Sequence, residues 1–173
     1  MNESDLTTRI ASGDKEALRE AYELCSRQLY MFARALTNRN LSDAEDVLQE
    51  CFVRVWERRR HLGSVRNLRA YLFTTLRNVY LNFARSESRE MKRRAESAGL
   101  VVTGPPDDPV AAERLDQALD TLPEEQRQVV VLKVWGGLTL AEIAGVLDES
   151  ENTVASRYRY GLNKLRKLLG DVL

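Results

Sequence analysis

Apolar residues recur every three or four positions in three segments of the first half of the chain, which is the spacing of one face of an α-helix. The three segments are residues 14–37, 42–60 and 67–85. Asp14 is the predicted N-cap of the first segment, and Ser42 with Glu45 three residues later predicts a capping box at the start of the second. Three amphipathic helices joined by short loops can bury one common core, so the pattern predicts a small helical domain.

The helical spacing fails between residues 86 and 108, where charged and small residues are mixed with glycine and proline. This composition is typical of a flexible linker. Helical spacing then returns in four shorter segments: residues 110–121, 124–134, 139–147 and 150–169. The sequence therefore predicts an all-α protein of two small helical domains joined by a flexible linker. The predicted divisions are residues 1–88, 89–109 and 110–173.

The last two segments have the outline of a helix-turn-helix, a motif that binds DNA. A capping box of Thr139 and Glu142 opens the first helix, and Asp148 and Glu149 form the turn. The second helix has five basic residues and no acidic residue between positions 152 and 170. The residues predicted on or near its groove-facing side are Asn152, Thr153, Ala155, Ser156, Arg159 and Tyr160, flanked by Arg157. Arginine can bond guanine twice, and the shorter polar side chains can bond base edges or phosphates.

The formal net charge is zero, from 26 basic and 26 acidic side chains in 173 residues, but the two signs are separated along the chain. Residues 51–94 carry 12 basic and 3 acidic side chains, whereas residues 1–50 carry 6 and 10. Residues 95–126 carry one basic and eight acidic side chains. Neutrality is therefore a cancellation between segments, and it does not exclude a nucleic-acid partner.

The basic block lies on and after the third helix, where arginines alternate with aromatic and amide side chains. The residues of this block that we expect to contact nucleic acid are Tyr71, Arg77, Asn78, Asn82, Arg85 and Arg89. Aromatic rings stack on unpaired bases and amides read exposed Watson–Crick edges, so the combination favours single-stranded or opened nucleic acid. Most aromatic residues of the block are also expected to belong to the core.

Residues of the catalytic and metal-binding types are scarce. Cys25 and Cys51 lack CxxC spacing and are predicted to be buried thiols, and His61 is the single histidine. The chain has no Gly-rich phosphate loop, HExxH or GxSxG motif, so we expect no cofactor, no metal site and no enzymatic activity. It also lacks a signal peptide and any apolar run long enough to cross a membrane, so the expected location is the cytoplasm.

The second predicted helix carries four acidic residues in its first turns: Asp43, Glu45, Asp46 and Glu50. Acidic side chains are favourable near a helix N-terminus because of the helix dipole, which explains part of this cluster. A protein partner that meets this end of the helix is the other explanation.

Three runs of the sequence, taken in order, resemble regions two and four of the extracytoplasmic-function (ECF) class of bacterial sigma factors. The runs are DAEDVLQECFVRVW (43–56), LRAYLFTTLRNVYLNFARSESR (68–89) and LPEEQRQVVVLKVWGGLTLAEIAGVLDESENTVASRYRYGLNKLR (122–166). Together with the acidic, proline-containing linker they cover almost the whole chain. The resemblance implies a promoter-specificity subunit of bacterial RNA polymerase that has no chemistry of its own.

The resemblance also implies which partners the chain binds. Core RNA polymerase is expected to contact it through its flap and through the clamp of its largest subunit, and Asp46, Gln49 and Glu50 match the clamp-contacting positions. The helix from residue 151 is expected to read the minus-thirty-five promoter element. An anti-sigma factor, which such proteins often have, is a further expected partner.

The segment that matches residues 71–89 recognises and helps to unpair the minus-ten promoter element in the family. Asn78 matches a position in a loop that holds a flipped base, and Asn82 lies one helical turn further on. Base flipping costs unstacking energy, so a shaped pocket with amide groups suits this step.

This sequence departs from the family pattern at three positions. Ala155 stands where a basic residue is usual, and Tyr160 stands where an arginine is usual. Arg159 and Tyr160 are therefore expected to redistribute the contacts of the last helix, which would alter the preferred promoter sequence. Tyr71 stands where tryptophan is common, a change that preserves an aromatic ring.

A second hypothesis is a stand-alone helix-turn-helix regulator whose N-terminal domain dimerises or binds an effector. It predicts a symmetric dimer and tight operator binding without polymerase. The acidic helix 43–56, followed directly by the basic block, favours the sigma-factor hypothesis, because a dimerisation domain needs neither feature.

Overall fold

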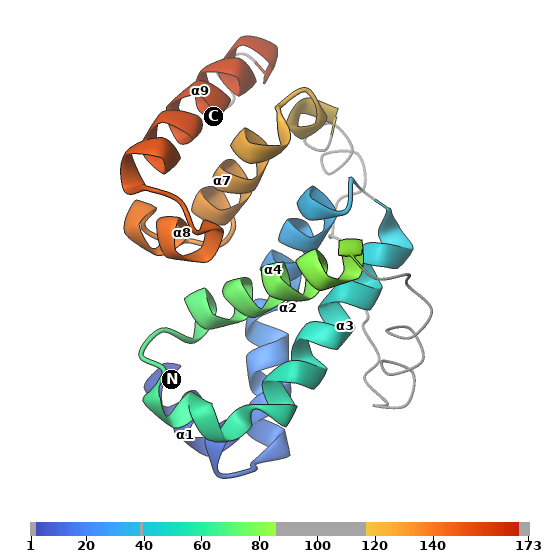
Figure 1. The fold of residues 1–173 in the computed structure, drawn as a ribbon, viewed down its shortest axis with the longest axis vertical. Coiled ribbons are helices and arrows are strands. Elements are labelled where there is room, and N and C mark those ends of the chain that lie inside the picture. Colours follow the sequence, from blue (N-terminus) through green and yellow to red (C-terminus); the bar gives the residue numbers. More distant parts are fainter. Residues whose placement is uncertain (1–2, 39, 86–116, 170–173) are drawn as a thin grey trace. The chain divides into compact units, whose positions relative to one another are not determined.

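The computed structural model describes residues 3–38, 40–85 and 117–169, which are helical and contain no strand (Figure 1). The elements are α1 (Glu3–Ala11), α2 (Lys15–Leu36), α3 (Leu41–Glu57), the 3₁₀ helix η1 (Arg59–Ser64), α4 (Leu68–Arg85), α7 (Glu124–Val134), α8 (Leu140–Leu147) and α9 (Glu151–Leu169). The described residues belong to two compact units, one before and one after the stretch 86–116. The predicted linker and the predicted domain boundaries lie in that stretch, outside the described residues. The all-α prediction is confirmed.

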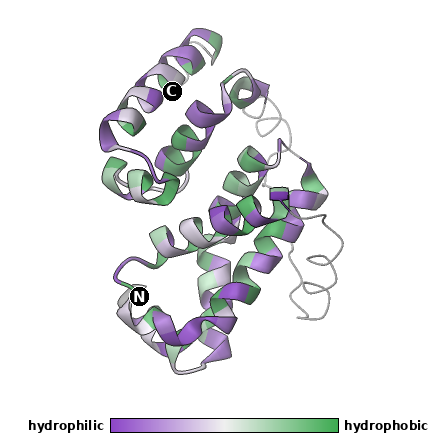
Figure 2. Ribbon diagram, viewed as in Figure 1, coloured by the Kyte–Doolittle hydropathy of each residue, from purple (hydrophilic) through white to green (hydrophobic). Residues whose placement is uncertain are grey.

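The core of the first unit lies between α2, α3 and α4, which pack against one another in pairs. Each of these helices shows hydrophobic positions along one side and hydrophilic positions along the other (Figure 2). Aromatic rings join the helices edge to face: the Phe32 and Phe73 centroids are 5.6 Å apart, and those of Tyr22 and Phe52 are 5.0 Å apart. Such pairs stabilise a core beyond the area that they bury.

Helix α1 is absent from the sequence prediction. This helix has nine residues, and its large apolar residues are mainly Leu6 and Ile10. Two apolar positions are too few to establish a helical period from the sequence. Both side chains are fully buried, because α1 packs against η1 and α2. Tertiary packing therefore stabilises a helix that is too short to be predicted from its own pattern.

The N-cap prediction for α2 is confirmed. Asp14 Oδ1 accepts hydrogen bonds from the backbone N–H groups of Glu16 and Ala17 at 2.9 and 3.3 Å. Arg9 of α1 donates to Asp14 Oδ2 at 2.9 Å, and this hydrogen bond holds the pKa of Asp14 below its usual 3.8. The ionised carboxylate therefore contributes stability above the unfolded pKa, and that contribution is lost as the pH falls through the lowered folded pKa.

The capping box predicted at Ser42 and Glu45 is wrong. The N-cap of α3 is Asn40, whose side-chain oxygen accepts from the backbone N–H of Asp43 at 3.2 Å. Asparagine caps a helix as well as serine does, and it lies two residues earlier. The far end also differs, because α3 ends at Glu57 and the chain continues as the 3₁₀ helix η1 instead of reaching residue 60 as one α-helix. The third predicted helix is confirmed as α4, whose start is capped by Asn67 accepting from Ala70 N at 2.9 Å.

The second unit packs α7 along α9 and α8 across the start of α9. The capping box of Thr139 and Glu142 is confirmed, with hydrogen bonds of 3.2 and 2.7 Å between each side chain and the other residue's backbone N–H. Helix α9 has a glycine where it meets α7: a Cβ on Gly161 would lie 2.8 Å from Val130 Cγ2. The glycine therefore permits the close approach of these two helices.

The turn between α8 and α9 contains a left-handed residue, Asp148, at φ 56° and ψ 48°. We expect Asp148→Gly to raise the free energy of unfolding of the second unit by about 0.5–1 kcal/mol, because glycine adopts this conformation without a Cβ clash. Asp148→Ala is the matched control and should lower it by a similar amount. Denaturant unfolding followed by Trp135 fluorescence, in a Trp56→Phe background, measures both; equal stabilities of the two variants would contradict the prediction.

Candidate nucleic-acid interface

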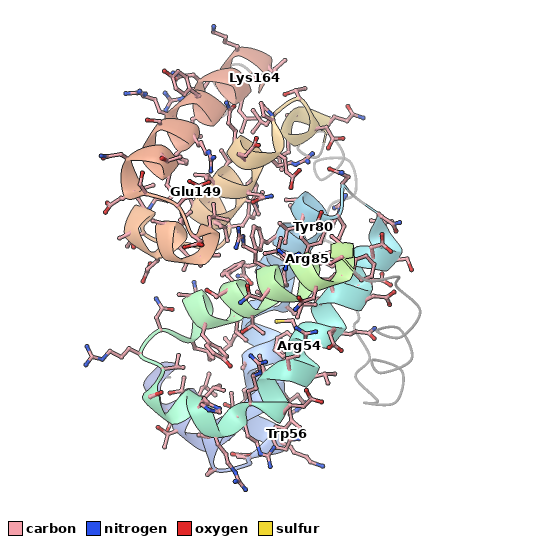
Figure 3. The ribbon with its side chains drawn as sticks, in the orientation of Figure 1. Arg54, Trp56, Tyr80, Arg85, Glu149 and Lys164 are labelled. Atoms are coloured by element: carbon pink, nitrogen blue, oxygen red, sulfur yellow. The ribbon has the colours of Figure 1, made fainter. Side chains whose placement is uncertain are left out.

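Four of the residues predicted to contact opened nucleic acid lie on one stripe of α4. Tyr71, Asn78, Asn82 and Arg85 are separated by seven, four and three positions, which places them within about 60° around a helix. Asn78, Asn82 and Arg85 are exposed, and Tyr71 is partly exposed. Figure 3 shows Arg85 at the end of this helix. The remaining members differ: Arg77 is partly exposed on a neighbouring face, and Arg89 lies outside the described residues.

Asn78 lies within α4, as the apolar spacing of residues 67–85 predicts, although the resemblance matches it to a loop position. The helix runs unbroken from Leu68 to Arg85. The backbone groups of Asn78 take part in the helix, so only its side-chain amide is available to a base. Phe73, an aromatic of the same block, is buried in the core at 2% exposure, whereas Tyr71, Tyr80 and Phe83 are partly exposed. The expectation that most of these aromatics belong to the core is therefore confirmed fully only for Phe73.

The segment that leads into and forms α4 is basic and has no acidic residue of its own. Residues 58–85 contain seven arginines and no aspartate or glutamate. Five of these arginines are exposed: Arg58, Arg60, Arg66, Arg69 and Arg85. Arg59 instead stacks on Trp56, with its guanidinium carbon 4.6 Å from the ring centroid. An arginine-rich surface of this kind attracts a phosphate backbone.

Helix α9 turns its predicted polar face outward. Val154, Gly161 and Leu165 are buried and define the inner face. Asn152, Arg159 and Tyr160 are exposed, and three further candidates are partly exposed: Thr153, Ser156 and Arg157. The Arg159 guanidinium carbon lies 5.3 Å from the centroid of the Tyr160 ring. Arg159 therefore has an aromatic neighbour at the surface that helps to hold its side chain.

Two of the predicted α9 contacts already have partners within the protein. The Thr153 hydroxyl lies 2.8 Å from Ser150 Oγ, and Ser150 Oγ also accepts from Thr153 N at 3.1 Å. Arg157 donates to Glu149 Oε1 at 3.0 Å across the turn. The spacing of eight residues between this acid and this base is not a helical contact spacing, so the sequence pattern did not indicate the pair.

The three residues expected to contact polymerase do not share one environment. Asp46 and Gln49 are partly exposed on α3, whereas Glu50 is only 1% exposed. Glu50 Oε1 accepts from Arg54 Nε at 2.9 Å, and Glu50 Oε2 has no hydrogen-bond partner. A polymerase contact by Glu50 stays a prediction, and the structure shows that its carboxylate is buried in this chain. Arg54, labelled in Figure 3, is the partly exposed member of this pair.

Within the part of the chain that the structure describes, no group of three or more His, Cys, Asp or Glu side chains is arranged to hold a metal ion. Cys25 and Cys51 are buried cysteines that form no disulfide, and burial raises the pKa of the Cys51 thiol. None of the described helices is both long and apolar enough to span a bilayer.

Comparison with known proteins places this geometry in a family. Residues 21–90 match the family model of Sigma-70 region 2, and residues 112–165 match that of Sigma-70, region 4. The chain is 32% identical over 167 residues to the ECF RNA polymerase sigma factor SigL of Mycobacterium tuberculosis, with 94% of each protein covered. It is 30% identical to the ECF RNA polymerase sigma factor SigK of Mycobacterium ulcerans, covering 95% of this chain and 91% of that protein.

Two solved structures are similar in fold. One is the sigma factor RpoE in complex with the anti-sigma factor NepR from Bartonella quintana, with a TM-score of 0.69 and 25% identity over 90% of this chain and 98% of that one. The other is CnrH in complex with the cytosolic domain of CnrY, also with a TM-score of 0.69 and 25% identity, over 98% of both chains. The fold and its two sequence regions define a sigma factor of the Sigma-70 type. The chain belongs to the ECF RNA polymerase sigma factors, which direct promoter recognition and are not enzymes.

Proposed function

We propose that the two units divide promoter recognition between them. The stripe of α4 takes the opened strand of the minus-ten element, α9 takes the minus-thirty-five duplex, and the exposed face of α3 binds the polymerase clamp. The observation that carries this proposal is the separation of two basic helical segments without acidic residues, 58–85 in the first unit and 152–169 in the second, from the acidic first turns of α3. Two basic surfaces suit two segments of DNA, and the acidic one suits a basic protein surface.

The amide stripe supports the assignment of opened DNA to α4. Asn78 and Asn82 lie one turn apart, and Tyr71 lies two turns before Asn78 on the same side of α4. The amides can bond the Watson–Crick edge of an unstacked base, and the ring can stack on another base of the same strand. The exposed Arg85 at the end of the stripe then binds a neighbouring phosphate.

The partners follow from this assignment. Core RNA polymerase binds the chain through its clamp and flap, and the protein works in the cytoplasm, where it meets polymerase and promoter. It acts by binding and contributes no catalytic group. One of the two similar structures contains a sigma factor bound by an anti-sigma factor, and this supports an anti-sigma factor for the present chain as well.

A transcription assay with core polymerase tests the proposal. The full chain, mixed with core enzyme, should co-elute with it and should start transcripts on a subset of fragments from a pooled genomic library. The alternative, a stand-alone regulator, predicts a symmetric dimer that binds its operator tightly without polymerase. A chain that binds DNA specifically in the absence of core enzyme, and never co-elutes with it, would overturn the proposal in favour of that alternative.

We expect Asp46→Ala and Gln49→Ala each to weaken core-polymerase binding by about 1–3 kcal/mol without lowering the melting temperature. Both side chains reach the surface of α3, so their loss removes contacts and leaves the core intact. Glu23→Ala, which removes an exposed carboxylate from α2, is the matched control and should bind normally. Fluorescence anisotropy with labelled core enzyme measures the affinities, and unchanged binding by both variants would place the polymerase contact elsewhere.

We expect Asn78→Ala to slow promoter opening more than it weakens the closed complex, because its amide contacts a base only after the strands separate. A template with a preformed bubble over the minus-ten element should restore most of the initiation rate. Stopped-flow detection of opening and run-off transcription on both templates give the two rates. An equal defect on both templates would show that Asn78 does not act at the opening step.

A further inference from the structure

The Glu149–Arg157 ion pair ties the turn of the helix-turn-helix to the second turn of α9. Arg157 Nη1 lies 3.0 Å from Glu149 Oε1, and the two side chains are 27% and 36% exposed. Figure 3 shows Glu149 at the start of α9. The neighbouring link, between Ser150 and Thr153, fixes the first turn of the same helix. The Glu149–Arg157 ion pair and the Ser150–Thr153 hydrogen bonds therefore fix the orientation of the first turns of α9 relative to the preceding turn.

The position of Arg157 around the helix separates it from the other candidate DNA contacts. At about 100° per residue, Arg157 projects about 60° from the direction of the buried Val154. Asn152, Ser156 and Arg159 project about 140–160° from that direction, on the opposite side of the helix. Arg157 thus lies on the flank of α9 next to the turn, and the residues that can enter a major groove lie on the far side.

The charge next to Arg157 is unfavourable to a phosphate. The turn and the first residue of α9 carry three carboxylates, on Asp148, Glu149 and Glu151. A phosphate that approached Arg157 would come close to the Glu149 carboxylate, which already accepts a hydrogen bond from the Arg157 guanidinium. The pair therefore offers DNA little net positive charge, in contrast to the exposed Arg159.

We propose that Glu149 and Arg157 form a positioning pair for the recognition helix. Arg157 does not contact DNA; it acts through Glu149 to fix the orientation at which α9 presents Asn152, Ser156 and Arg159 to the bases. Glu149, an acid beside a DNA-binding surface, then increases specific binding. This inference rests on the proposed function of α9 in reading duplex promoter DNA.

The experiment compares four variants of the full chain bound to core polymerase: Glu149→Gln, Arg157→Ala, the double variant, and the charge swap Glu149→Arg with Arg157→Glu. The probes are a duplex selected by the wild-type complex from a randomised pool and a scrambled duplex of equal length, across a salt series. If the wild-type complex selects no sequence at all, the proposed function fails. If it selects one, the behaviour of the variants tests the positioning pair alone.

We expect each single variant to weaken binding to the selected duplex by about two- to fivefold, as the loss of a partly exposed pair allows. The double variant should equal the singles, and the charge swap should recover part of the loss. The affinity for the scrambled duplex should not fall. The steepness with which the logarithm of the binding constant decreases with the logarithm of the salt concentration should also stay the same. A phosphate contact by Arg157 would instead flatten the salt slope by about 0.9 in Arg157→Ala and would let Glu149→Gln bind both duplexes more tightly; this result, or no effect of any variant, overturns the proposal.

Discussion

Replacing Arg54 by alanine is expected to lower the free energy of unfolding of the first unit by about 3–5 kcal/mol, the cost of leaving a buried charge without a partner. Arg54 is the only hydrogen-bond partner of the Glu50 carboxylate among the described residues, and Glu50 is 1% exposed. Its Oε2 atom already lacks a partner, so the carboxylate has no second group to which it can turn.

Trp56 fluorescence in a Trp135→Phe background follows the unfolding of this unit in denaturant. Arg58→Ala is the matched control, because Arg58 is exposed at the end of the same helix and its loss should change stability by less than about 0.5 kcal/mol. Replacing the pair together, as Arg54→Met with Glu50→Leu, should give a protein at least as stable as the wild type, since apolar residues of similar volume need no partners. A double variant as unstable as Arg54→Ala would attribute the loss to the packing of Arg54 and not to the lone carboxylate.

The Glu50–Arg54 pair distinguishes Glu50 from the other acidic residues near the start of α3. Asp43 and Glu45 lie in the first turns of α3 and gain from the helix dipole, whereas Glu50 lies further along and is stabilised by Arg54 four residues later. A loss of polymerase binding in a Glu50 variant would therefore reflect a changed shape of α3. Asp46 and Gln49, which reach the surface of α3, are the residues proposed to make direct contacts.

Arg159→Ala is expected to weaken binding of the polymerase complex to its promoter duplex by about 1–3 kcal/mol and to relax the preference at one base position of the minus-thirty-five element. Arg159 is exposed on the outer face of α9, and Tyr160 beside it limits the orientations of its guanidinium. A guanidinium held in this way can donate two hydrogen bonds to one guanine.

Selection from a randomised duplex pool, followed by affinity measurements on single-base variants, separates base readout from phosphate binding. Arg166→Ala is the matched control, because it removes the same charge from an exposed position in the last turn of α9. It should leave the base preferences unchanged. A uniform loss of affinity over all sequences in Arg159→Ala, with a reduced salt slope, would make Arg159 a phosphate contact.

Most of the fold followed from the spacing of apolar residues, and the exceptions have physical causes. The long helices α2, α4 and α9 were predicted to within a few residues because each has an apolar stripe and a recognisable start, such as Asp14 or Asn67. The start of α3 was predicted two residues late because Asn40 and Ser42 are both good caps, and only the backbone shows which one is used. Helix α1 was missed because its stability comes from burial against η1 and α2.

The candidate sites divide in the same way. Apolar spacing placed Tyr71, Asn78, Asn82 and Arg85 on one predicted helix, and the structure adds that these four positions lie along one stripe of α4. Spacing did not indicate that Glu50 is buried, because a helix position is interior only relative to the helices packed around it.

The sequence by itself determined the helical class, the separation of positive and negative segments, and the basic stretch 152–170 without an acidic residue, since these depend on the period and identity of neighbouring residues. The tertiary structure alone decided which charges are available to a partner. Glu50 is buried and forms an ion pair with Arg54. Glu149, next to the left-handed residue Asp148, forms an ion pair with Arg157. Both outcomes depend on distances between side chains, and these exist only once the helices have packed and the chain has turned.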